Sequence, residues 1–395
     1  ATGTELWAYD TSNQSQWRVT DIRSGSVGSN PGEYSSILVE DTLYFSANDG
    51  STGHELWAHN TSNVTTWQVA NIRSGSSHSN PGSNMVHVVN GVLYFNAHDG
   101  NKGMELWKHD PSTGTTSRIH DINAGSTGSS TGKYLNMAVD DVLYFSANDG
   151  STGSELWAYN TSNSSDPWRV MDINSGSTGS EPGKHMSLLV GDTIYFDAGA
   201  TGGRELWAHD ISNQSTWRVV DIYTGSIGSE PGDSMALLVG DTIYFDAEDG
   251  STGDELWAHD TSNHSTWQVT DIASGSSSSA PGSYMSILVG DTVYFSASAA
   301  STGHELWAHD TSNHSTWQVA DINNWIMMGG MGLSSYPGQY MAVPLGDTIY
   351  FSAAVEQQGT ELWAHDTSNH STWKVADIDA SIWGSEPGYW MENLV

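Results

Sequence analysis

Hydrophobic and polar residues follow one pattern that repeats along the chain. The phrase Glu-Leu-Trp occurs eight times, with copies that begin at Glu5, Glu55, Glu105, Glu155, Glu205, Glu255, Glu305 and Glu361. Six intervals are 50 residues long and the last is 56. A fixed period of this size is typical of solenoids and propellers, in which one unit cannot bury its apolar surface until a neighbour packs on it. The repeat therefore predicts one closed domain over residues 1–395.

One repeat carries the pattern of four β-strands. Two β-rich runs in residues 283–297 flank Gly290-Asp291, a two-residue hairpin signal. Residues 305–310 and 317–322 are predicted as the third and fourth strands, separated by a polar turn. Large apolar side chains occupy both faces of the Tyr-Phe runs, as in sheets that are covered on both sides. Four-stranded units of this kind predict a β-propeller, with a solenoid of parallel strands as the alternative.

The different strands of the repeat do not all occur the same number of times. The Glu-Leu-Trp strand occurs eight times, whereas the Tyr-Phe strand occurs seven times. We therefore expect an all-β fold, a single β-propeller with eight blades of four antiparallel strands. Residues 1–23 would form an N-terminal half blade that pairs with a C-terminal strand at 388–395, and this blade would lack one strand. A truncated chain, a three-stranded blade and a strand donated by another subunit each account for the vacancy; the alternative fold has seven blades and projecting terminal strands.

The end of the third strand resembles a known repeat. Glu-Leu-Trp-x-x-Asp closes with Asp in six units and with Asn60 and Asn160 in two. This phrase resembles the ELWxxDGT-repeat proteins, and the resemblance covers essentially the whole chain. It implies a secreted or cell-surface microbial protein of propeller architecture, and it implies no reaction. Here Thr-Ser-Asn follows the acid in most copies where the family has Gly-Thr, so the turn is longer and more polar.

That turn contains an Asn-x-Ser/Thr triplet in seven of the eight units. The triplets begin at Asn13, Asn63, Asn163, Asn213, Asn263, Asn313 and Asn369. An exposed hairpin tip is the setting that N-glycosylation requires. The middle residue varies while the Asn and the hydroxyl residue stay, so we expect covalent glycans here. The alternative is a polar turn that duplication copied.

The balance of charge restricts the partners. The chain has 46 Asp plus Glu against 12 Lys plus Arg, a formal net charge of −34. Such a field repels phosphate backbones and anionic membranes, so we expect no nucleic-acid partner. No apolar run approaches the roughly 20 residues of a spanning helix, so no membrane insertion is expected. The chain lacks cysteine, which excludes disulfides and thiolate sites. Either the chain is cytosolic or Ala1 is a processed start, and the glycosylation triplets favour an extracellular or cell-surface location.

Four Gly-rich segments between the second and third strands are candidate calcium sites. They begin at Asp49, Asp99, Asp149 and Asp249, and their carboxylate and hydroxyl oxygens are ligands that Ca²⁺ prefers. Their spacing differs from that of an EF-hand, and three other units lack the Asp. We therefore expect no required cofactor, with calcium as an option at these four positions and a plain turn as the alternative.

The repeated residues do not predict an active site. Tyr9 and Tyr159 replace the His of Ala-His-Asp, which indicates a filler between blades, and the repeated Trp is typical of a core position. Catalysis needs an asymmetric set of groups at one place. Near-identical units offer none, and the Gly-x-Ser-x-Gly, phosphate-loop and His-Glu-x-x-His motifs are absent. We therefore expect a protein that is not an enzyme.

One loop is strongly apolar, and it contains the six extra residues of the last interval. Met and Trp side chains on a Gly-rich loop are typical of an adaptable contact surface. The alternative is that the loop folds inward and plugs the channel of the ring. The expected assembly contact comprises Trp325, Ile326, Met327, Met328, Met331, Leu333, Trp383 and Trp390.

These observations favour a non-enzymatic, extracellular, glycosylated structural protein that self-assembles into a homo-oligomer, filament or surface layer. A carbohydrate-binding or adhesion propeller is the second hypothesis. A polysaccharide-active enzyme is the third.

Overall fold

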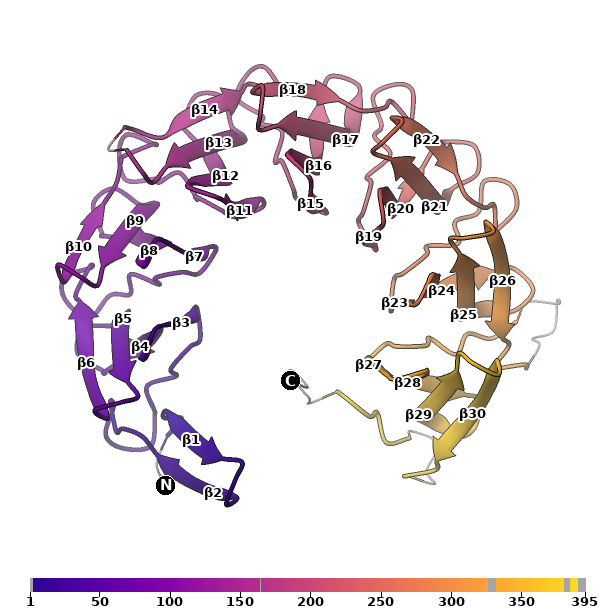
Figure 1. The fold of residues 1–395 in the computed structure, drawn as a ribbon, viewed down its shortest axis with the longest axis horizontal. Helices are drawn as coiled ribbons and strands as arrows, with labels where there is room; N and C mark the ends of the chain where they lie inside the picture. The colour runs from indigo at the N-terminus through magenta and orange to yellow at the C-terminus, as the bar shows by residue number, and fades with distance from the viewer. Residues whose placement is uncertain (1–2, 164, 326–331, 380–383, 390–395) are drawn as a thin grey trace. The chain divides into compact units, whose positions relative to one another are not determined.

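The computed structural model describes residues 3–163, 165–325, 332–379 and 384–389, which form thirty β-strands (Figure 1). They divide into two compact units. Unit 1 contains residues 1–184 and 198–200, and unit 2 contains residues 185–197 and 201–395. Within the described residues, no helix has the length and apolar character needed to cross a membrane.

Unit 1 begins with a two-stranded sheet, β1–β2, and continues with three four-stranded sheets in which consecutive strands are neighbours. The strands are β1 (Trp7–Asp10), β2 (Ser15–Arg18), β3 (Ser36–Val39), β4 (Thr42–Asn48), β5 (His54–Asn60), β6 (Thr65–Ala70), β7 (Val86–Val89), β8 (Val92–His98), β9 (Met104–Asp110), β10 (Thr115–Arg118), β11 (Asn136–Val139), β12 (Val142–Asn148), β13 (Ser154–Asn160) and β14 (Trp168–Met171).

Four further four-stranded sheets follow, with the same order of strands. Their strands are β15 (Ser187–Val190), β16 (Thr193–Ala200), β17 (Gly203–Asp210), β18 (Ser215–Arg218), β19 (Ala236–Val239), β20 (Thr242–Glu248), β21 (Asp254–Asp260), β22 (Ser265–Gln268), β23 (Ser286–Val289), β24 (Thr292–Ala299), β25 (Gly303–Asp310), β26 (Ser315–Ala320), β27 (Ala342–Leu345), β28 (Thr348–Val355), β29 (Gly359–Asp366) and β30 (Ser371–Ala376). The predicted all-β class and the eightfold repeat of antiparallel sheets of an eight-bladed propeller are confirmed. The predicted pairing of residues 1–23 with 388–395 stays a prediction, because 390–395 lie outside the described residues.

The hydrophobic core lies between consecutive sheets. In one cluster Tyr244, Leu256 and Ala258 of one sheet pack against Val293 and Phe295 of the next, and all five are buried. In this cluster, residues of one sheet are thus covered by the neighbouring sheet. This core makes each repeat depend on the next, as the period of the sequence predicts.

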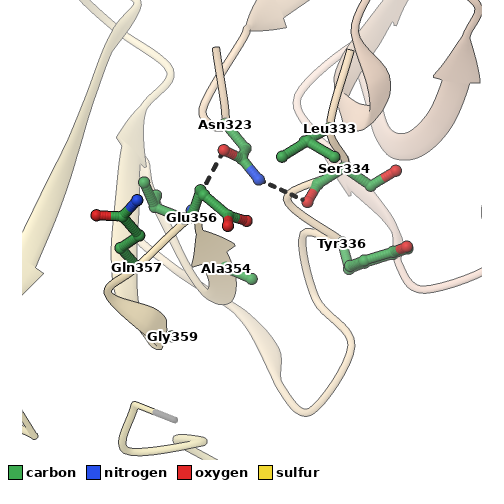
Figure 2. A pocket seen from close by; sticks show the side chains of 9 residues that line it. Asn323, Leu333, Ser334, Tyr336, Ala354, Glu356, Gln357 and Gly359 are labelled. Atoms are coloured by element: carbon green, nitrogen blue, oxygen red, sulfur yellow. Dashed lines mark hydrogen bonds between the residues drawn. The ribbon is translucent and has the colours of Figure 1, made fainter. Parts of the chain in front are cut away.

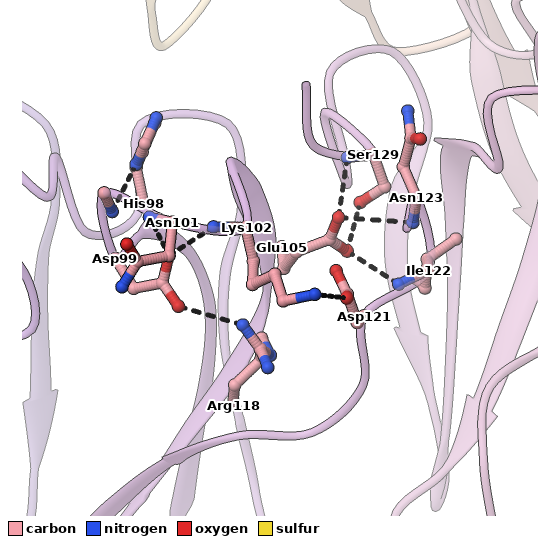
Figure 3. A network of polar contacts seen from close by, with 11 residues as sticks. His98, Asp99, Asn101, Lys102, Glu105, Arg118, Asp121, Ile122, Asn123 and Ser129 are labelled. Atoms are coloured by element: carbon pink, nitrogen blue, oxygen red, sulfur yellow. Dashed lines mark hydrogen bonds and ion pairs between the residues drawn. The ribbon is translucent and has the colours of Figure 1, made fainter. Parts of the chain in front are cut away.

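The Glu of the repeated phrase holds the connection between sheets. Buried Glu105 accepts hydrogen bonds from the backbone N–H of Ile122 (3.0 Å) and from the hydroxyl of Ser129 (2.8 Å) (Figure 3). An equivalent serine donates to the equivalent glutamate in all eight copies. The repeated carboxylate is therefore a structural clasp, which ties the loop after each fourth strand to the third strand.

The repeated His and Trp are packing residues, as predicted. The Nδ1 atom of His259 lies 2.8 Å from the hydroxyl of Thr266, and its ring centroid lies 5.4 Å from that of Tyr195 in the preceding sheet. Tyr159 takes the same place beside Tyr94, at 6.0 Å between centroids. Trp257 packs against the core between sheets as a partly buried side chain.

The turn between the third and fourth strands and the connection after the fourth strand lie at opposite ends of each sheet. In the sheet β23–β26, the backbone N–H of Thr311, in the turn after β25, donates to Asp291 O in the β23–β24 hairpin (2.9 Å). At the other end, the backbone N–H of Ser335, in the connection after β26, donates to His304 O (2.9 Å). The end with the connection after the fourth strand carries the residues that differ most among the repeats.

Candidate functional site: an acidic cavity in unit 2

The residue before each Glu-Leu-Trp differs among the repeats although the next three residues do not. It is Thr4, His54, Met104, Ser154, Arg204, Asp254, His304 or Thr360. In the sheet β19–β22 this residue is Asp254, and it lies directly opposite Glu248 of β20. Asp246 is paired with Leu256, so side-chain alternation places Asp246, Glu248 and Asp254 on one face of the sheet.

These carboxyl groups line a cavity of about 190 Å³ together with Ser229, Glu230 and Asp233. Pockets for whole small molecules are usually roughly 300–1,000 Å³. The cavity is therefore sized for one chemical group or ring of a larger ligand.

Asp246 is the most deeply placed acid of the cavity, with 1% of its surface exposed. Its carboxylate accepts hydrogen bonds from the backbone N–H groups of Met235 (2.7 Å) and Ser234 (3.0 Å). Ser46 and Asn96 occupy this position in other sheets and accept the equivalent bonds. The sequence thus places an ionisable group where other repeats use a neutral one.

Burial raises the pKa of Asp246 to about 7, although its backbone hydrogen bonds oppose the shift. Burial also raises the pKa of Asp254 to about 8, and the charges of Asp246, Glu255, Asp233 and Glu248 add to this effect. Two interacting acids titrate as a pair, so these values describe two successive proton losses. Near neutral pH the pair holds a proton.

The preceding sheet shows how the same two positions are neutralised. There Asp197 replaces Asp246 and Arg204 replaces Asp254, and the guanidinium lies 2.5 Å from the carboxylate. Both side chains are buried. The sheet β19–β22 has two acids in place of this ion pair, because Asp254 stands where the preceding sheet has Arg204.

Polar contacts of His185 and Arg204 hold the wall toward the preceding sheet. Nδ1 of His185 lies 2.6 Å from Asp233, and Nε2 lies 3.2 Å from Glu230. Nε of Arg204 also lies 3.5 Å from Glu230. These contacts fix two carboxylates at the rim of the cavity.

Glu230 has a left-handed backbone conformation, with φ of 47°. The same conformation recurs at Asn30, Asn80, Ser130, Glu181, Ala280, Tyr336 and Glu386, with φ between 45° and 51° over all eight copies. Residues other than Gly rarely adopt it, because Cβ crowds the following carbonyl. The fold therefore holds a side chain of variable identity at this strained position, in the connection from each sheet to the next.

The next sheet places aromatic rings at the same sheet end. The centroid of Tyr284 lies 5.4 Å from that of His304 and 5.3 Å from that of Tyr336, and the two rings of His304 and Tyr336 are stacked at 5.9 Å. Tyr336 is an exposed residue. Tyr340 and Tyr389 form a further edge-to-face pair at 5.3 Å.

Tyr336 also lines a larger cavity of about 420 Å³ (Figure 2). Buried Asn323 holds one side of it, because its Nδ2 donates to Ser334 O (3.1 Å) and its Oδ1 accepts the N–H of Glu356 (3.3 Å). Glu356 and Gln357, in the β28–β29 turn, also line this cavity. Residues with amide, carboxylate and phenol side chains thus line one cavity.

The predicted calcium positions are occupied by local hydrogen bonds. The carboxylate of Asp49 accepts the backbone N–H groups of Ser51 (2.8 Å) and Thr52 (2.7 Å). Burial raises the pKa of Asp49, but these bonds outweigh it and the net shift is downward. No group of three or more His, Asp or Glu in the described part of the chain is arranged to hold a metal ion. Calcium at Asp49, Asp99, Asp149 and Asp249 stays a prediction.

All seven predicted glycosylation residues are exposed and lie in the turn before the fourth strand. Among the predicted assembly residues, Trp325 is exposed and Leu333 lines the larger cavity. Ile326, Met327, Met328, Met331, Trp383 and Trp390 lie outside the described residues. Neither modification nor assembly at these positions is tested, and both stay predictions.

Asp246 and Asp254 are not among the predicted site residues. The repeats are so similar in sequence that no asymmetric set of groups was predicted. The signal was the variable residue before Glu-Leu-Trp, combined with the Ser-to-Asp changes after Tyr-Phe at Asp197 and Asp246. Asp246 and Asp254 are 8 residues apart in the sequence, and only the pairing of β20 with β21 places them on one face of the sheet.

No protein-family model matches the chain, and no curated protein matches it. Solved structures with a similar fold include a prolyl endopeptidase, with a TM-score of 0.42 and 11% identity over 87% of this chain and 49% of its own. Puromycin hydrolase has a TM-score of 0.40 and 12% identity, over 89% of this chain and 54% of its own. An oligogalacturonate lyase from Vibrio parahaemolyticus has a TM-score of 0.41 and 11% identity, over 88% of this chain and 92% of its own. The chain spans about half the length of the first two.

These matches run against two predictions. The similar structures are those of peptidases and a lyase, whereas a non-enzymatic structural protein and a chain without enzymatic activity were predicted, and neither prediction is retained. At this level of identity the likeness concerns the fold alone and assigns no reaction.

Proposed function

We propose that the chain is a glycoside hydrolase that acts on neutral saccharides at the acidic cavity of the sheet β19–β22. The observation that carries this proposal is the pair Asp246 and Asp254, two acids on one sheet face that retain a proton near neutral pH because burial raises both pKa values. Acid-catalysed cleavage of a glycosidic bond needs one protonated carboxyl group, which donates the proton, and a neighbouring carboxylate that is charged.

The sign of the charge favours this reaction class. Cleavage of a glycosidic bond passes through a transition state with oxocarbenium character, which is positive, and the carboxylates Glu230, Asp233 and Glu248 stabilise positive charge. Acyl transfer develops a negative oxyanion, and a polyuronate carries carboxylates of its own. Both would be repelled by this wall and by the net charge of −34.

The residues take separate roles in this mechanism. The Asp254 carboxyl donates its proton to the glycosidic oxygen as the bond from that oxygen to the anomeric carbon breaks. Water adds to the anomeric carbon, and its proton passes to the Glu248 carboxylate opposite Asp254. Burial raises the pKa of Asp254 most, and the charge of Asp246 adds to this effect, so Asp246 is a positioning residue.

The neighbouring aromatic residues support a saccharide as the ligand. Tyr284, His304 and Tyr336 form a cluster of rings in the next sheet, and an exposed ring face packs well against the C–H groups of a sugar. The larger cavity beside Tyr336 supplies amide and carboxylate groups that bind hydroxyls. These features extend the proposed binding surface beyond the small acidic cavity.

The test is hydrolysis of a panel of neutral oligosaccharides, measured as new reducing ends. We expect the wild-type chain to cleave at least one of them and Asp254→Asn to lose at least a hundredfold in kcat. Asp241→Asn is the matched control, because Asp241 is exposed in the hairpin at the opposite end of the same sheet. No cleavage of any neutral saccharide, or full activity of Asp254→Asn, would reject the proposal.

A further inference from the structure

Three of the turns between a third and a fourth strand carry a histidine five residues after the buried histidine of the Ala-His-Asp phrase. The three histidine pairs are His259 with His264, His309 with His314, and His365 with His370. Other repeats have Gln, Val, Gly or Ser at the second position. Histidine is thus the second member in three repeats of unit 2, always at the same spacing.

The first histidine of each pair is buried and fixed. His259, His309 and His365 expose 0%, 1% and 0% of their surface. Each Nδ1 atom lies 2.8 or 2.9 Å from the hydroxyl of the threonine seven residues later. Each Nε2 atom is buried and has no hydrogen-bond partner among the residues that the structure describes. A neutral imidazole that donates from Nδ1 to the threonine has a lone pair on Nε2, which is the atom that a metal ion binds.

The second histidine of each pair is exposed, and the turn fixes its backbone. The backbone N–H of His264 donates to Asp260 O (2.8 Å), and φ of His264 is 60°. His314 and His370 make the equivalent bond (2.8 and 2.9 Å), with φ of 60° and 61°. The same turn conformation therefore presents the second histidine in all three pairs.

The two members of a pair lie close together. His259 and His264 line one cavity of about 180 Å³, with aromatic and aliphatic side chains of the preceding repeat as its other walls. The ring centroids of His309 and His314 are 6.4 Å apart, a separation that one ion with metal–nitrogen bonds of about 2 Å can bridge. The cavity is smaller than the roughly 300 Å³ of most small-molecule sites, but an ion with several water molecules of about 30 Å³ each fits it.

The electrostatic surroundings suit a cation. Burial, followed by the charge of His264, lowers the pKa of His259 to about 4. The same causes lower the pKa of His309 and His365 to about 4. The buried imidazoles are therefore neutral at neutral pH, which is the form that binds metal. The net charge of −34 also raises the local concentration of cations.

We propose that each of the three histidine pairs is a binding site for a divalent transition-metal ion that prefers imidazole, with Cu²⁺ bound most tightly. The ligands are Nε2 of the buried histidine and the ring of the exposed histidine. Because the described ranges hold no metal-binding group of three or more His, Asp or Glu, water supplies the remaining ligands. This inference goes beyond the proposed reaction, since the pairs lie at the end of the sheets opposite the acidic cavity.

The probe is Cu²⁺, titrated against the full chain in about 0.15 M salt with excess Mg²⁺, which occupies sites made of oxygen ligands. Electron paramagnetic resonance reports the ligand atoms, and we expect three ions per chain with nitrogen hyperfine coupling. A triple variant with His264→Gln, His314→Gln and His370→Gln should lose these ions and bind Cu²⁺ at least about tenfold more weakly. Gln214 occupies the equivalent position with φ of 61°, so the turn accepts glutamine.

Three further variants separate these sites from binding at surface carboxylates. His259→Tyr should lose one of the three ions, and Tyr159 shows that the position accepts tyrosine. Val64→His should add a fourth ion beside His59, because φ of Val64 is 58° and matches that of the histidine turns. His120→Gln, outside the three pairs, is the matched control and should change nothing. A signal without nitrogen coupling, equal binding by the wild type and the triple variant, or no added ion in Val64→His would each overturn the proposal.

Discussion

At the scale of single residues, two positions carry the chemistry of the sheet β19–β22. The same positions hold an ion pair in one sheet, Asp197 with Arg204, and two acids in the next, Asp246 with Asp254. A single exchange of Arg for Asp thus converts a neutralised site into one that stores a proton. The contrast shows how a repeat protein creates a singular site without a new motif.

The Asp254→Arg variant tests this contrast. Burial raises the folded pKa values of Asp246 and Asp254 to about 7 and about 8, above the unfolded values of about 4. Such groups contribute stability below the unfolded pKa, and this contribution is lost as pH rises through 7 and 8. We expect the Tm of the wild type to fall between pH 6 and pH 9, and the arginine variant to show a smaller fall and no hydrolysis. Thermal unfolding at the two pH values checks this, and an equal fall in both proteins would contradict it.

The pH dependence of hydrolysis is a second expectation at this scale. Asp254 must be protonated to act as the acid, so kcat/KM should decline as pH rises through about 8. A pH–rate profile measured with a neutral saccharide gives this decline. Activity that increases above pH 9 would exclude Asp254 as the acid.

At the scale of elements, the connection between sheets combines a clasp with a strained residue. The glutamate of each repeated phrase holds the connection through a serine hydroxyl, as Glu205 does through Ser229 (2.7 Å). The next residue is Glu230, which is forced into positive φ. The hydrogen bond from the serine to the glutamate stabilises the connection. It thereby keeps the next residue, whose identity varies among the repeats, in a left-handed conformation that an unconstrained loop would not maintain. Diversity among the repeats is concentrated at this point.

The substitution Ala280→Gly measures the strain. A left-handed conformation costs an L-residue about 1–2 kcal/mol, and the greater freedom of unfolded glycine offsets about 0.5–1 kcal/mol of the relief. Ala280 has φ of 46°, so glycine should stabilise the fold by about 0.5–1 kcal/mol in denaturant unfolding. The nearby Gly282→Ala should instead destabilise it by about 2 kcal/mol, because the new Cβ would lie 2.5 Å from Cβ of Met235. Opposite signs for the two variants are the expected result, and equal signs would contradict the argument.

At the scale of the whole molecule, the net charge of −34 dominates. Self-repulsion of this size opposes folding, and salt screens it with a Debye length that falls from about 30 Å at 0.01 M to about 8 Å at 0.15 M. The same charge lowers the local concentration of anionic ligands. It favours neutral and cationic ligands at every surface of the molecule.

Salt should therefore stabilise the chain. We expect Tm to rise steadily as sodium chloride increases from about 0.01 M to about 0.5 M, because screening weakens repulsion more than it weakens the few ion pairs present. Scanning calorimetry in sodium chloride, with sucrose as a control for non-ionic stabilisation, gives the measurement. A Tm that falls with salt would show that attractive pairs such as Asp197–Arg204 outweigh the net repulsion.

The architecture could be predicted from the sequence because it rests on local and periodic signals. The hairpin signal Gly290-Asp291, the polar turn 311–315 and the Tyr-Phe and Glu-Leu-Trp runs each predict one element, and β23 to β26 lie where these signals place them. Period and strand count follow from repetition itself. The buried side of the Tyr-Phe strands could also be inferred, since both of their faces are apolar.

The acidic cavity depended on tertiary structure. Asp246 and Asp254 are among 46 acids, and their departure from the other repeats marks them in the sequence without showing that they are buried together. Their raised pKa values arise from burial by the connection that contains Asp233 and from the register that aligns them on one face. The sequence by itself determined the repeat, the strands and their turns, because these follow from local propensity and period. Only the tertiary structure decided which carboxyls lose water and face one another, because desolvation and through-space charge act between residues that the chain brings together on folding.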